Sequence, residues 1–240
     1  MSLYKENISG KMKYSVPVIY YDMTDSTNLR AKEYIKNYRP ARAVIVAGGQ
    51  SAGRGRLGRD FYSPSGTGIY MTYILRAEGS LCDAVRITTA AAVAVAEAIG
   101  ENARIKWVND IYIGGKKVCG ILTEAVKDGN DLYIIIGIGI NVTTCDFPDD
   151  LRDSAASIGD TDKTGLIARI CDSLYNVETV DYIDRYRKRL LWRGEQIVYT
   201  ENNKAVPATL VDVDGAGGLI VMTDGNKKTL RSGEISIRNR

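Results

Sequence analysis

Histidine is absent from all 240 residues of this sequence. Its absence excludes Ser-His-Asp and Cys-His catalytic centres, histidine general bases and metal sites with histidine ligands. Any chemistry must therefore depend on lysine, arginine, carboxylates, backbone amides or a cation that arrives with a substrate.

Closely spaced cysteine pairs are missing as well. The four cysteines lie far apart and form no CxxC motif, which disfavours zinc binding and dithiol redox chemistry. We expect buried free thiols at all four positions, which are Cys82, Cys119, Cys145 and Cys171.

No apolar run is long enough for a membrane span. The longest, ITTAAAVAVAEAIG at 87–100, is short and interrupted by Glu97, and the amino-terminal segment lacks the apolar core of a signal peptide. The composition is 45% hydrophobic and 25% charged, with a net charge of only +3. These values predict a globular cytoplasmic protein without a broad nucleic-acid-binding surface.

Hydrophobic periodicity predicts a mixed α and β architecture. We expect helices over 28–38, 81–100, 163–177 and 181–191, and strands over 16–23, 42–49, 68–75, 104–113, 116–126 and 131–142. Gly114-Gly115 and the KDGN tetrapeptide at 127–130 predict hairpin turns. The fold class expected is α+β, with a mixed, largely antiparallel sheet flanked by helices over 1–190. Short alternating strands with DG and GG turns predict a small β-barrel over 191–240.

The segment GGQSAGRGRLGRDFYSP at 48–64 places three arginines among glycines. Glycine permits close approach of the backbone to a ligand, and the arginine fork suits phosphate or carboxylate. A solvated basic loop would explain the charges but not the even spacing of the glycines. We expect an anion-binding loop whose arginines have no partners in the free protein, so that residues 51–60 are mobile there.

The TDSTN stretch at 24–28 precedes the first expected helix. Capping of that helix by Asp25 or Ser26 is the simpler explanation. Alternatively, the hydroxyls of Ser26 and Thr27 present hydrogen-bond donors and acceptors to a ligand.

The hairpin KWVNDIYIGGKKVCGILTEA at 106–125 carries charges that a purely structural hairpin does not need. A two-residue turn at Gly114-Gly115 would pair Tyr112 with Lys117 and Asp110 with Cys119. Asp110 and Lys117 would then be diagonal neighbours, roughly 7–8 Å apart, as in a reaction site. Lys117 and Gly120 are three residues apart, so they can line one cleft only with a β-bulge or a longer turn.

The strand DLYIIIGIGINV at 131–142 divides by alternation into two faces. One face carries isoleucines, and the other carries Gly137, Gly139 and Asn141. Glycines inside a strand mark the close approach of a ligand or another backbone. Gly120 on the neighbouring strand can face the same open space above the sheet.

These motifs, DSTN, GGQSAGRGRLGRDFYSP, KWVNDIYIGGKKVCGIL and GIGINV, resemble in order and spacing those of biotin protein ligases over residues 20–145. The tail SGEISIR is similar to the end of the family's SH3-like carboxy-terminal domain. One departure is Val108, where the family commonly has proline, which affects local stiffness. The resemblance implies a class II synthetase-like biotin–lipoate ligase fold. The motifs begin near the amino terminus, so we expect the form without a DNA-binding domain and no binding to DNA or membranes.

The resemblance implies a two-step reaction that uses biotin, ATP and Mg²⁺ arriving with ATP. Biotin's carboxylate attacks the α-phosphate to give biotinyl-5′-AMP and pyrophosphate, and a lysine of a biotin carboxyl carrier domain then attacks the mixed anhydride. A carboxylate is already ionised at neutral pH, which agrees with the missing histidine. Homodimers through the central sheet are common in the family, so a homodimer is expected.

The resemblance also implies roles for matching positions. The catalytic residues would be Lys117, Arg54 and Asp110, with Lys117 stabilising developing charge and Asp110 orienting the network or the carrier lysine. Biotin would contact Ser26, Thr27, Asn28, Gln50, Arg54, Gly55, Arg56, Lys117, Gly120, Gly137 and Gly139. The nucleotide would contact Arg54, Arg56, Asn109, Lys117 and Asn141, where Asn109 and Asn141 would contact either the nucleotide or its metal. No metal site of the protein's own is expected.

Two alternatives stay open. A lipoate or octanoyl ligase would leave Ser26, Thr27 and Gln50 without ligand partners, which is unfavourable for buried polar groups. An anion- or nucleic-acid-binding module built on the arginine loop predicts salt-dependent binding that does not depend on biotin.

Overall fold

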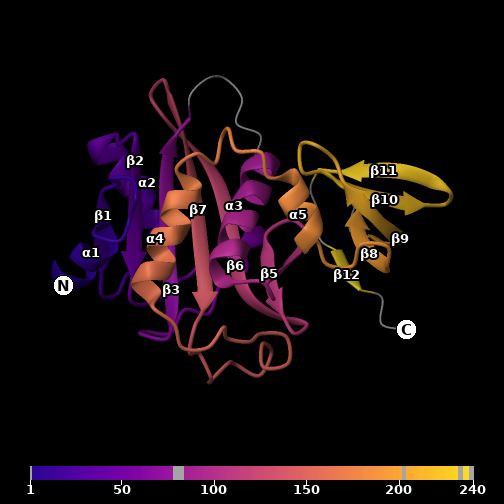
Figure 1. Ribbon diagram of the computed structural model, residues 1–240, viewed down its shortest axis with the longest axis horizontal. Helices are drawn as coiled ribbons and strands as arrows, with labels where there is room; N and C mark the ends of the chain where they lie inside the picture. The colour runs from indigo at the N-terminus through magenta and orange to yellow at the C-terminus, as the bar shows by residue number, and fades with distance from the viewer. Residues whose placement is uncertain (1, 78–83, 202–203, 232–234, 238–240) are drawn as a thin grey trace.

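The computed structural model describes residues 2–77, 84–201, 204–231 and 235–237. A large α/β body carries the amino terminus, and a smaller all-β body beside it carries the carboxy terminus (Figure 1). Helix α5 lies next to the smaller body and packs against its strand β9.

A seven-stranded sheet forms the centre of the larger body, in the order β1-β2-β3-β7-β6-β5-β4. Only β1 and β2 pair in parallel, and every other neighbouring pair is antiparallel. The strands are Val18–Tyr21 (β1), Arg42–Ala47 (β2), Gly68–Arg76 (β3), Arg104–Lys106 (β4), Asp110–Ile113 (β5), Lys116–Asp128 (β6) and Asp131–Asn141 (β7). The predicted mixed, largely antiparallel sheet is confirmed.

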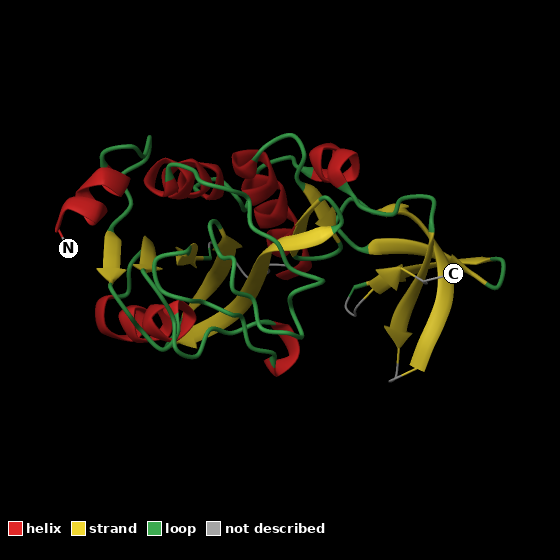
Figure 2. Cartoon of the chain, turned by 90° about the horizontal axis from the view of Figure 1, so that it is seen from below, coloured by secondary structure: helices red, strands yellow, loops and turns green. Residues whose placement is uncertain are grey.

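Helices cover both faces of this sheet, as the view from below shows (Figure 2). The elements are α1 (Ser2–Ser9), α2 (Thr27–Tyr38), the 3₁₀ turn η1 (Arg56–Gly58), α3 (Ala84–Ile99), α4 (Lys163–Leu174) and α5 (Ile183–Arg189). The predicted division of β7 is confirmed, since Ile136 and Ile138 pack in the large core with α3 and α4, whereas Ile135 packs with α2. The strand is therefore buried on both faces, and its glycines lie on the α2 side.

Two elements differ from the sequence prediction. Helix α1 was not expected, and its Ile8 is fully buried. The single strand expected over 104–113 is two strands, because β4 turns back and pairs with β5, Lys106 opposite Asp110. The segment 104–113 contains no glycine or proline to mark the turn at 107–109, so the sequence does not reveal it. Part of the helix expected over 81–100 lies outside the described residues, at 81–83.

The hairpin of β5 and β6 contains a β-bulge. Tyr112 pairs with Lys117 as predicted, but Asp110 pairs with Gly120 rather than Cys119, since the register shifts between Ile111 and Tyr112. The turn at Gly114-Gly115 has both glycines at positive φ, 58° and 80°, as a tight hairpin turn requires. Of the two geometries that would let Lys117 and Gly120 line one cleft, a β-bulge or a longer turn, the structure has the β-bulge.

The smaller body is a five-stranded antiparallel sheet with the order β11-β10-β9-β8-β12, as expected for an SH3-like domain. Its strands are Gln196–Glu201 (β8), Lys204–Val213 (β9), Leu219–Thr223 (β10), Asn226–Leu230 (β11) and Ile235–Ile237 (β12). Within the SGEISIR tail, positions 232–234 and 238 lie outside the described residues. The domain boundary at residue 190 stays a prediction.

The cysteine prediction is only partly correct. Cys119 and Cys171 are buried and free, whereas Cys145 is exposed in the long loop after β7. Cys82 lies outside the described residues. In the described part of the chain, no helix combines the length and apolar character needed to cross a bilayer.

Candidate functional site

One cavity of about 220 Å³ gathers almost all of the predicted site residues. It lies on the α2 side of the sheet, over β6 and β7, and is closed by the arginine loop. From the predicted set it is lined by Ser26, Thr27, Asn28, Gln50, Arg54, Gly55, Arg56, Asn109, Asp110, Lys117, Gly120, Gly137 and Gly139. Asn141 is the predicted residue that does not line it.

Lys117 and Asp110 form an ion pair at this cavity. Lys117 Nζ lies 2.8 Å from Asp110 Oδ1, and the two side chains are 33% and 18% exposed. Asn109 Nδ2 also donates to Asp110 Oδ1, at 3.1 Å. The bulge brings Asp110 opposite Gly120, and the side-chain amine of Lys117 lies over Gly120. The sequence predicted diagonal neighbours, and the structure has them in direct contact.

The arginine loop closes on itself at its base. Phe61 N donates to Gly53 O at 2.9 Å, and Gly55 N donates to Arg59 O at 2.7 Å. At its tip Leu57 is in the left-handed region, with φ 57°, and 74% exposed. Arg56 Nη1 donates to Asn109 Oδ1 at 3.0 Å, so the expectation that the arginines have no partners is wrong for Arg56. The mobility of the loop stays a prediction.

Gln50, rather than Asp25 or Ser26, satisfies the start of α2. Gln50 Oε1 accepts from Thr27 N at 2.8 Å and from Thr27 Oγ1 at 3.1 Å. Ser26 occupies the cap position in an extended conformation without a side-chain capping bond, and Asp25 Oδ1 accepts from Ser26 N instead. The expectation that Asp25 or Ser26 caps the first helix is therefore wrong. Gln50 Nε2 donates to Ser63 Oγ, at 2.9 Å.

A polar network that the sequence reasoning missed lies beneath these groups. Thr72 is fully buried, and its hydroxyl oxygen lies within hydrogen-bonding distance of Thr27 Oγ1, at 2.8 Å, and of Asn28 Oδ1, at 2.7 Å. Asn28 Nδ2 in turn donates to Glu124 Oε2 at 2.7 Å, and Lys32 Nζ lies 2.7 Å from Oε1 of the same carboxylate. Burial opposes ionisation of Glu124, but the bonds from Lys32 and Asn28 hold its pKa below the usual value. The available signal was a threonine in the apolar strand GIYMTYIL.

The strand glycines make room for neighbouring side chains. A Cβ on Gly137 would overlap the Asn28 amide, and a Cβ on Gly139 would overlap the ring of Phe61. At Gly120 a Cβ would lie 3.2 Å from Phe61 Cε2. The close approach expected from these glycines is therefore present, and Phe61 is a lining residue that the sequence analysis did not single out.

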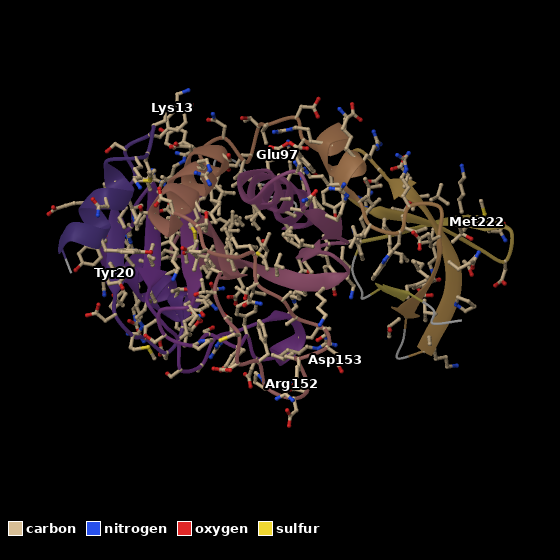
Figure 3. All side chains as sticks on the ribbon, turned by 60° about the horizontal axis from the view of Figure 1, so that its bottom comes forward. Lys13, Tyr20, Glu97, Arg152, Asp153 and Met222 are labelled. Atoms are coloured by element: carbon tan, nitrogen blue, oxygen red, sulfur yellow. The ribbon has the colours of Figure 1, made fainter. Side chains whose placement is uncertain are left out.

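The loop between β7 and α4 closes one side of the cavity with Leu151. The neighbouring Arg152 and Asp153 project from the molecule where this loop comes forward (Figure 3). Its backbone pairs with Lys117, since Lys117 N donates to Ser154 O and Ala156 N donates to Lys117 O. Asn141 Nδ2 donates to Ala156 O at 3.1 Å, so its side chain holds this loop. A nucleotide contact by Asn141 stays a prediction.

The charge of the cavity favours an anion. Two carboxylates line it, Asp60 and Asp110. Against these stand four cationic side chains, which are Arg54, Arg56, Arg59 and Lys117. In the described ranges, histidine, cysteine, aspartate and glutamate form no group of three or more that could hold a metal ion. Phosphate oxygens are preferred ligands of Mg²⁺, so this cavity fits a magnesium ion that is held by the phosphates of a bound nucleotide. Burial raises the pKa of the Cys119 thiol well above its usual range, which makes Cys119 a poor nucleophile.

Comparison with known proteins identifies this arrangement. The model of the biotin/lipoate A/B protein ligase family matches residues 20–141. A bifunctional ligase/repressor BirA of Bacillus subtilis is 35% identical over 92% of this chain and 74% of its own length. A biotin–[acetyl-CoA-carboxylase] ligase of Paracoccus denitrificans is 36% identical over 50% of this chain and 52% of its own.

The fold agrees with these matches. The biotin protein ligase from Aquifex aeolicus, solved in complex with biotin and ATP, superposes with a TM-score of 0.78 at 28% identity. The superposition covers 93% of this chain and 99% of the Aquifex chain. The chain therefore belongs to the biotin/lipoate A/B protein ligase family.

Proposed function

We propose that this chain is an ATP-dependent biotin protein ligase. It activates biotin with ATP to biotinyl-5′-AMP and transfers the biotin to a lysine of a carboxylase's biotin carboxyl carrier protein or domain. ATP and biotin are its substrates, and Mg²⁺ arrives with ATP.

The observation that carries this function is the polarity of the cavity. Its lining holds uncharged hydrogen-bonding groups at the start of α2, Ser26, Thr27 and Gln50. It also holds a charged group joined by side-chain contacts, in which Lys117 pairs with Asp110 and Arg56 bonds Asn109. Biotin has the matching distribution, with a neutral ureido ring at one end and a carboxylate at the other. Lipoate has a carboxylate but no ureido group, so it would add no hydrogen bonds to these groups, which would keep only their bonds to one another and to Ser63.

In the first step, an oxygen of the biotin carboxylate forms a bond to the α-phosphorus of ATP. The bond from that phosphorus to the bridging oxygen breaks, and pyrophosphate leaves with the electron pair. No proton moves, so the protein needs no general base here. In this proposal Lys117, Arg54 and Arg56 stabilise the negative charge that develops on the phosphate oxygens. Magnesium on the nucleotide supplies further positive charge.

In the second step, the carrier lysine's amine attacks the carbonyl carbon of biotinyl-5′-AMP. An amide bond forms, the bond from that carbon to the phosphate oxygen breaks, and AMP leaves with the electron pair. The amine nitrogen gives up one proton, which water takes up. Asp110 Oδ1 is already bound by Lys117 and Asn109. We therefore assign Asp110 an orienting role, in which the second carboxylate oxygen is the one available to the incoming amine.

The test is ATP–pyrophosphate exchange with the purified chain. Biotin should stimulate the exchange strongly, and lipoate and octanoate should not. Incubation with a carrier domain should then place biotin on a single lysine, as mass spectrometry would show. Exchange that lipoate stimulates as well as biotin would overturn the substrate assignment, and no exchange with either would support a binding module.

Three finer assignments belong to the same proposal. The requirement for ATP favours a cytoplasmic location. A homodimer through the central sheet is supported by β6, whose residues beyond Ile121 pair with β7 on one side and with no other described strand. Sedimentation with and without biotin and MgATP tests that state.

The Bacillus subtilis relative is named as a repressor as well as a ligase, and a gel-shift assay tests our expectation that this chain does not bind DNA.

A further inference from the structure

A relay of polar side chains connects β6 with the wall of the proposed reaction site. Its members, in order, are Glu124, Asn28, Thr72 and Thr27. At its outer end, Glu124 Oε1 lies 2.7 Å from Lys32 Nζ, and these two side chains are 29% and 34% exposed. At its inner end, Thr27 lines the cavity, whereas neither Glu124 nor Lys32 is among the described residues that line it.

The carboxylate of Glu124 fixes which way the Asn28 amide points. Burial opposes ionisation of this group, but the bonds from Lys32 and Asn28 hold the pKa of Glu124 below its usual value. An ionised carboxylate only accepts hydrogen bonds, so the Asn28 atom 2.7 Å from Glu124 Oε2 must be Nδ2, the donor. Asn28 Oδ1 therefore points to Thr72, and the missing side chain of Gly137 leaves room for the amide there.

Each further hydrogen bond of the relay then has one possible direction. Asn28 Oδ1 carries no hydrogen, so the Thr72 hydroxyl donates its only hydrogen to it, across 2.7 Å. The 2.8 Å contact between Thr72 Oγ1 and Thr27 Oγ1 needs a hydrogen that only Thr27 can then supply. Gln50 Oε1, 3.1 Å from Thr27 Oγ1, is an acceptor as well. Both contacts use the single Thr27 hydrogen, so toward a ligand Thr27 Oγ1 is an acceptor only.

We propose that the Lys32–Glu124 ion pair sets the direction of this relay, and so makes the reaction site specific for a ligand with an N–H group opposite Thr27. The proposal rests on the ligase function stated above and deepens it, because the ureido ring of biotin has two N–H donors. Glu124 and Lys32 are positioning residues that act through Asn28 and Thr72. An oxygen in place of the ligand N–H would face Thr27 Oγ1 with a lone pair, and two acceptors repel each other.

The test compares biotin with its two cyclic carbamate analogues, in each of which oxygen replaces one ureido N–H. All three compounds keep the carboxylate, so ATP–pyrophosphate exchange gives a kcat/KM for each. The unaltered chain should prefer biotin to at least one analogue by about a hundredfold or more. If it shows biotin-dependent exchange without such a preference, the acceptor role of Thr27 is overturned. If it shows no biotin-dependent exchange, it is the ligase function that fails.

Glu124→Gln should reverse the relay. Lys32 only donates, so it binds the new side-chain oxygen and turns the new amide N–H₂ toward Asn28. Asn28 then flips, Thr72 donates to Thr27, and the Thr27 hydrogen becomes available to a ligand. The preference for biotin over the discriminated analogue should fall about tenfold, and the KM for biotin should rise about fivefold, the scale of one neutral hydrogen bond. The kcat with biotin and the KM for ATP should change less than about twofold, since the relay does not reach the phosphates.

Glu97→Gln is the matched control. Glu97 is 34% exposed and pairs with Arg185 at 3.0 Å, and it is not among the described residues that line the cavity. Its loss should change the preference and the KM for biotin less than about twofold. An unchanged preference in folded Glu124→Gln would overturn the proposal. So would an equal fall in kcat with biotin and with the analogue, which is the result expected of a purely structural role.

A second variant tests the relay from its middle, even if Glu124→Gln does not fold. Thr72→Val keeps the shape of the side chain and removes the hydroxyl that connects Asn28 with Thr27. It should lower the preference for biotin about tenfold, and adding Glu124→Gln to it should lower the preference no further, because the two changes act on one relay. Circular dichroism checks that each variant is folded. A preference unchanged by Thr72→Val, or a double variant whose losses multiply, would overturn the proposal.

Discussion

Lys117 reaches Asp110 because its strand has one residue more than the strand opposite. In a regular ladder, Lys117 and Gly120 would point to opposite faces of the sheet. The shift in register at Ile111 and Tyr112 brings Gly120 opposite Asp110, and the 2.8 Å ion pair follows. The pair is only partly exposed, so its two charges are held at the cavity rather than dispersed in solvent.

Replacing Lys117 with alanine should reduce biotin-dependent pyrophosphate exchange by at least about a hundredfold, the scale of one lost transition-state donor. Lys116→Ala is the control, since Lys116 is the neighbouring residue and its Nζ donates to Arg152 O outside the cavity. The control should retain exchange and both variants should keep the circular dichroism spectrum. Near-normal exchange by folded Lys117→Ala would exclude Lys117 from the mechanism.

Asp110→Asn keeps the volume of the side chain and removes its charge. If that charge orients Lys117 and the carrier lysine, transfer from preformed biotinyl-5′-AMP should fall at least as much as adenylate formation does. Asp60→Asn changes the other carboxylate that lines the cavity and should affect both steps less. The orienting role is refuted if the transfer rate of Asp110→Asn equals that of the unaltered chain.

The elements were easier to predict than the turns between them. β7 follows directly from its alternation, because isoleucines on one face and glycines on the other leave one way to place the strand. The turn that separates β4 from β5 was missed because Trp107 and Val108 continue the apolar pattern and are both buried. The β-bulge was predicted only as one of two options, because a one-residue shift in register leaves no mark in the local sequence pattern.

The arginine loop gives a prediction at the scale of an element. Arg54 and Arg59 are exposed, and the tip around Leu57 is exposed and in a left-handed conformation. Trypsin should therefore cut the free protein at Arg54, Arg56 or Arg59. Biotin with MgATP should protect these bonds far better than ATP alone. The adenylate neutralises the charges of the arginines, and the loop becomes ordered over the bound adenylate.

Mass spectrometry of timed digests identifies the bonds that are cut. Cleavage elsewhere in the chain serves as the internal control, since the ligand should not slow it to the same degree. Equal protection by biotin with ATP and by ATP alone would contradict ordering by the adenylate.

At the scale of the whole molecule, the site depends on segments far apart in the chain. The start of α2, the arginine loop, the β5–β6 hairpin, β7 and the loop that carries Leu151 each supply part of one cavity. Motif order could predict the first four, because each has a recognisable sequence. It could not predict Leu151, Thr72 or Glu124, which enter the site only through tertiary packing.

Because binding at such a site joins these segments, ligand should stabilise the entire fold. Biotin with MgATP at a hundredfold excess over its dissociation constant should add about 2.7 kcal/mol to the free energy of unfolding. For a chain of this size, that corresponds to a rise in melting temperature of roughly 5–10 °C. Lipoate with MgATP should give a much smaller rise in differential scanning fluorimetry. A rise as large as that with biotin would contradict ureido recognition by Ser26, Thr27 and Gln50.

The bond from Thr27 N to Gln50 Oε1 has a consequence for measurement. The first amide of α2 is protected by a side chain that also lines the cavity. Any ligand that draws Gln50 toward itself weakens that protection, and any ligand that fixes Gln50 strengthens it. The hydrogen-exchange rate of this single amide is therefore an intrinsic reporter of whether the ureido end is occupied, readable without a label or a catalytic turnover.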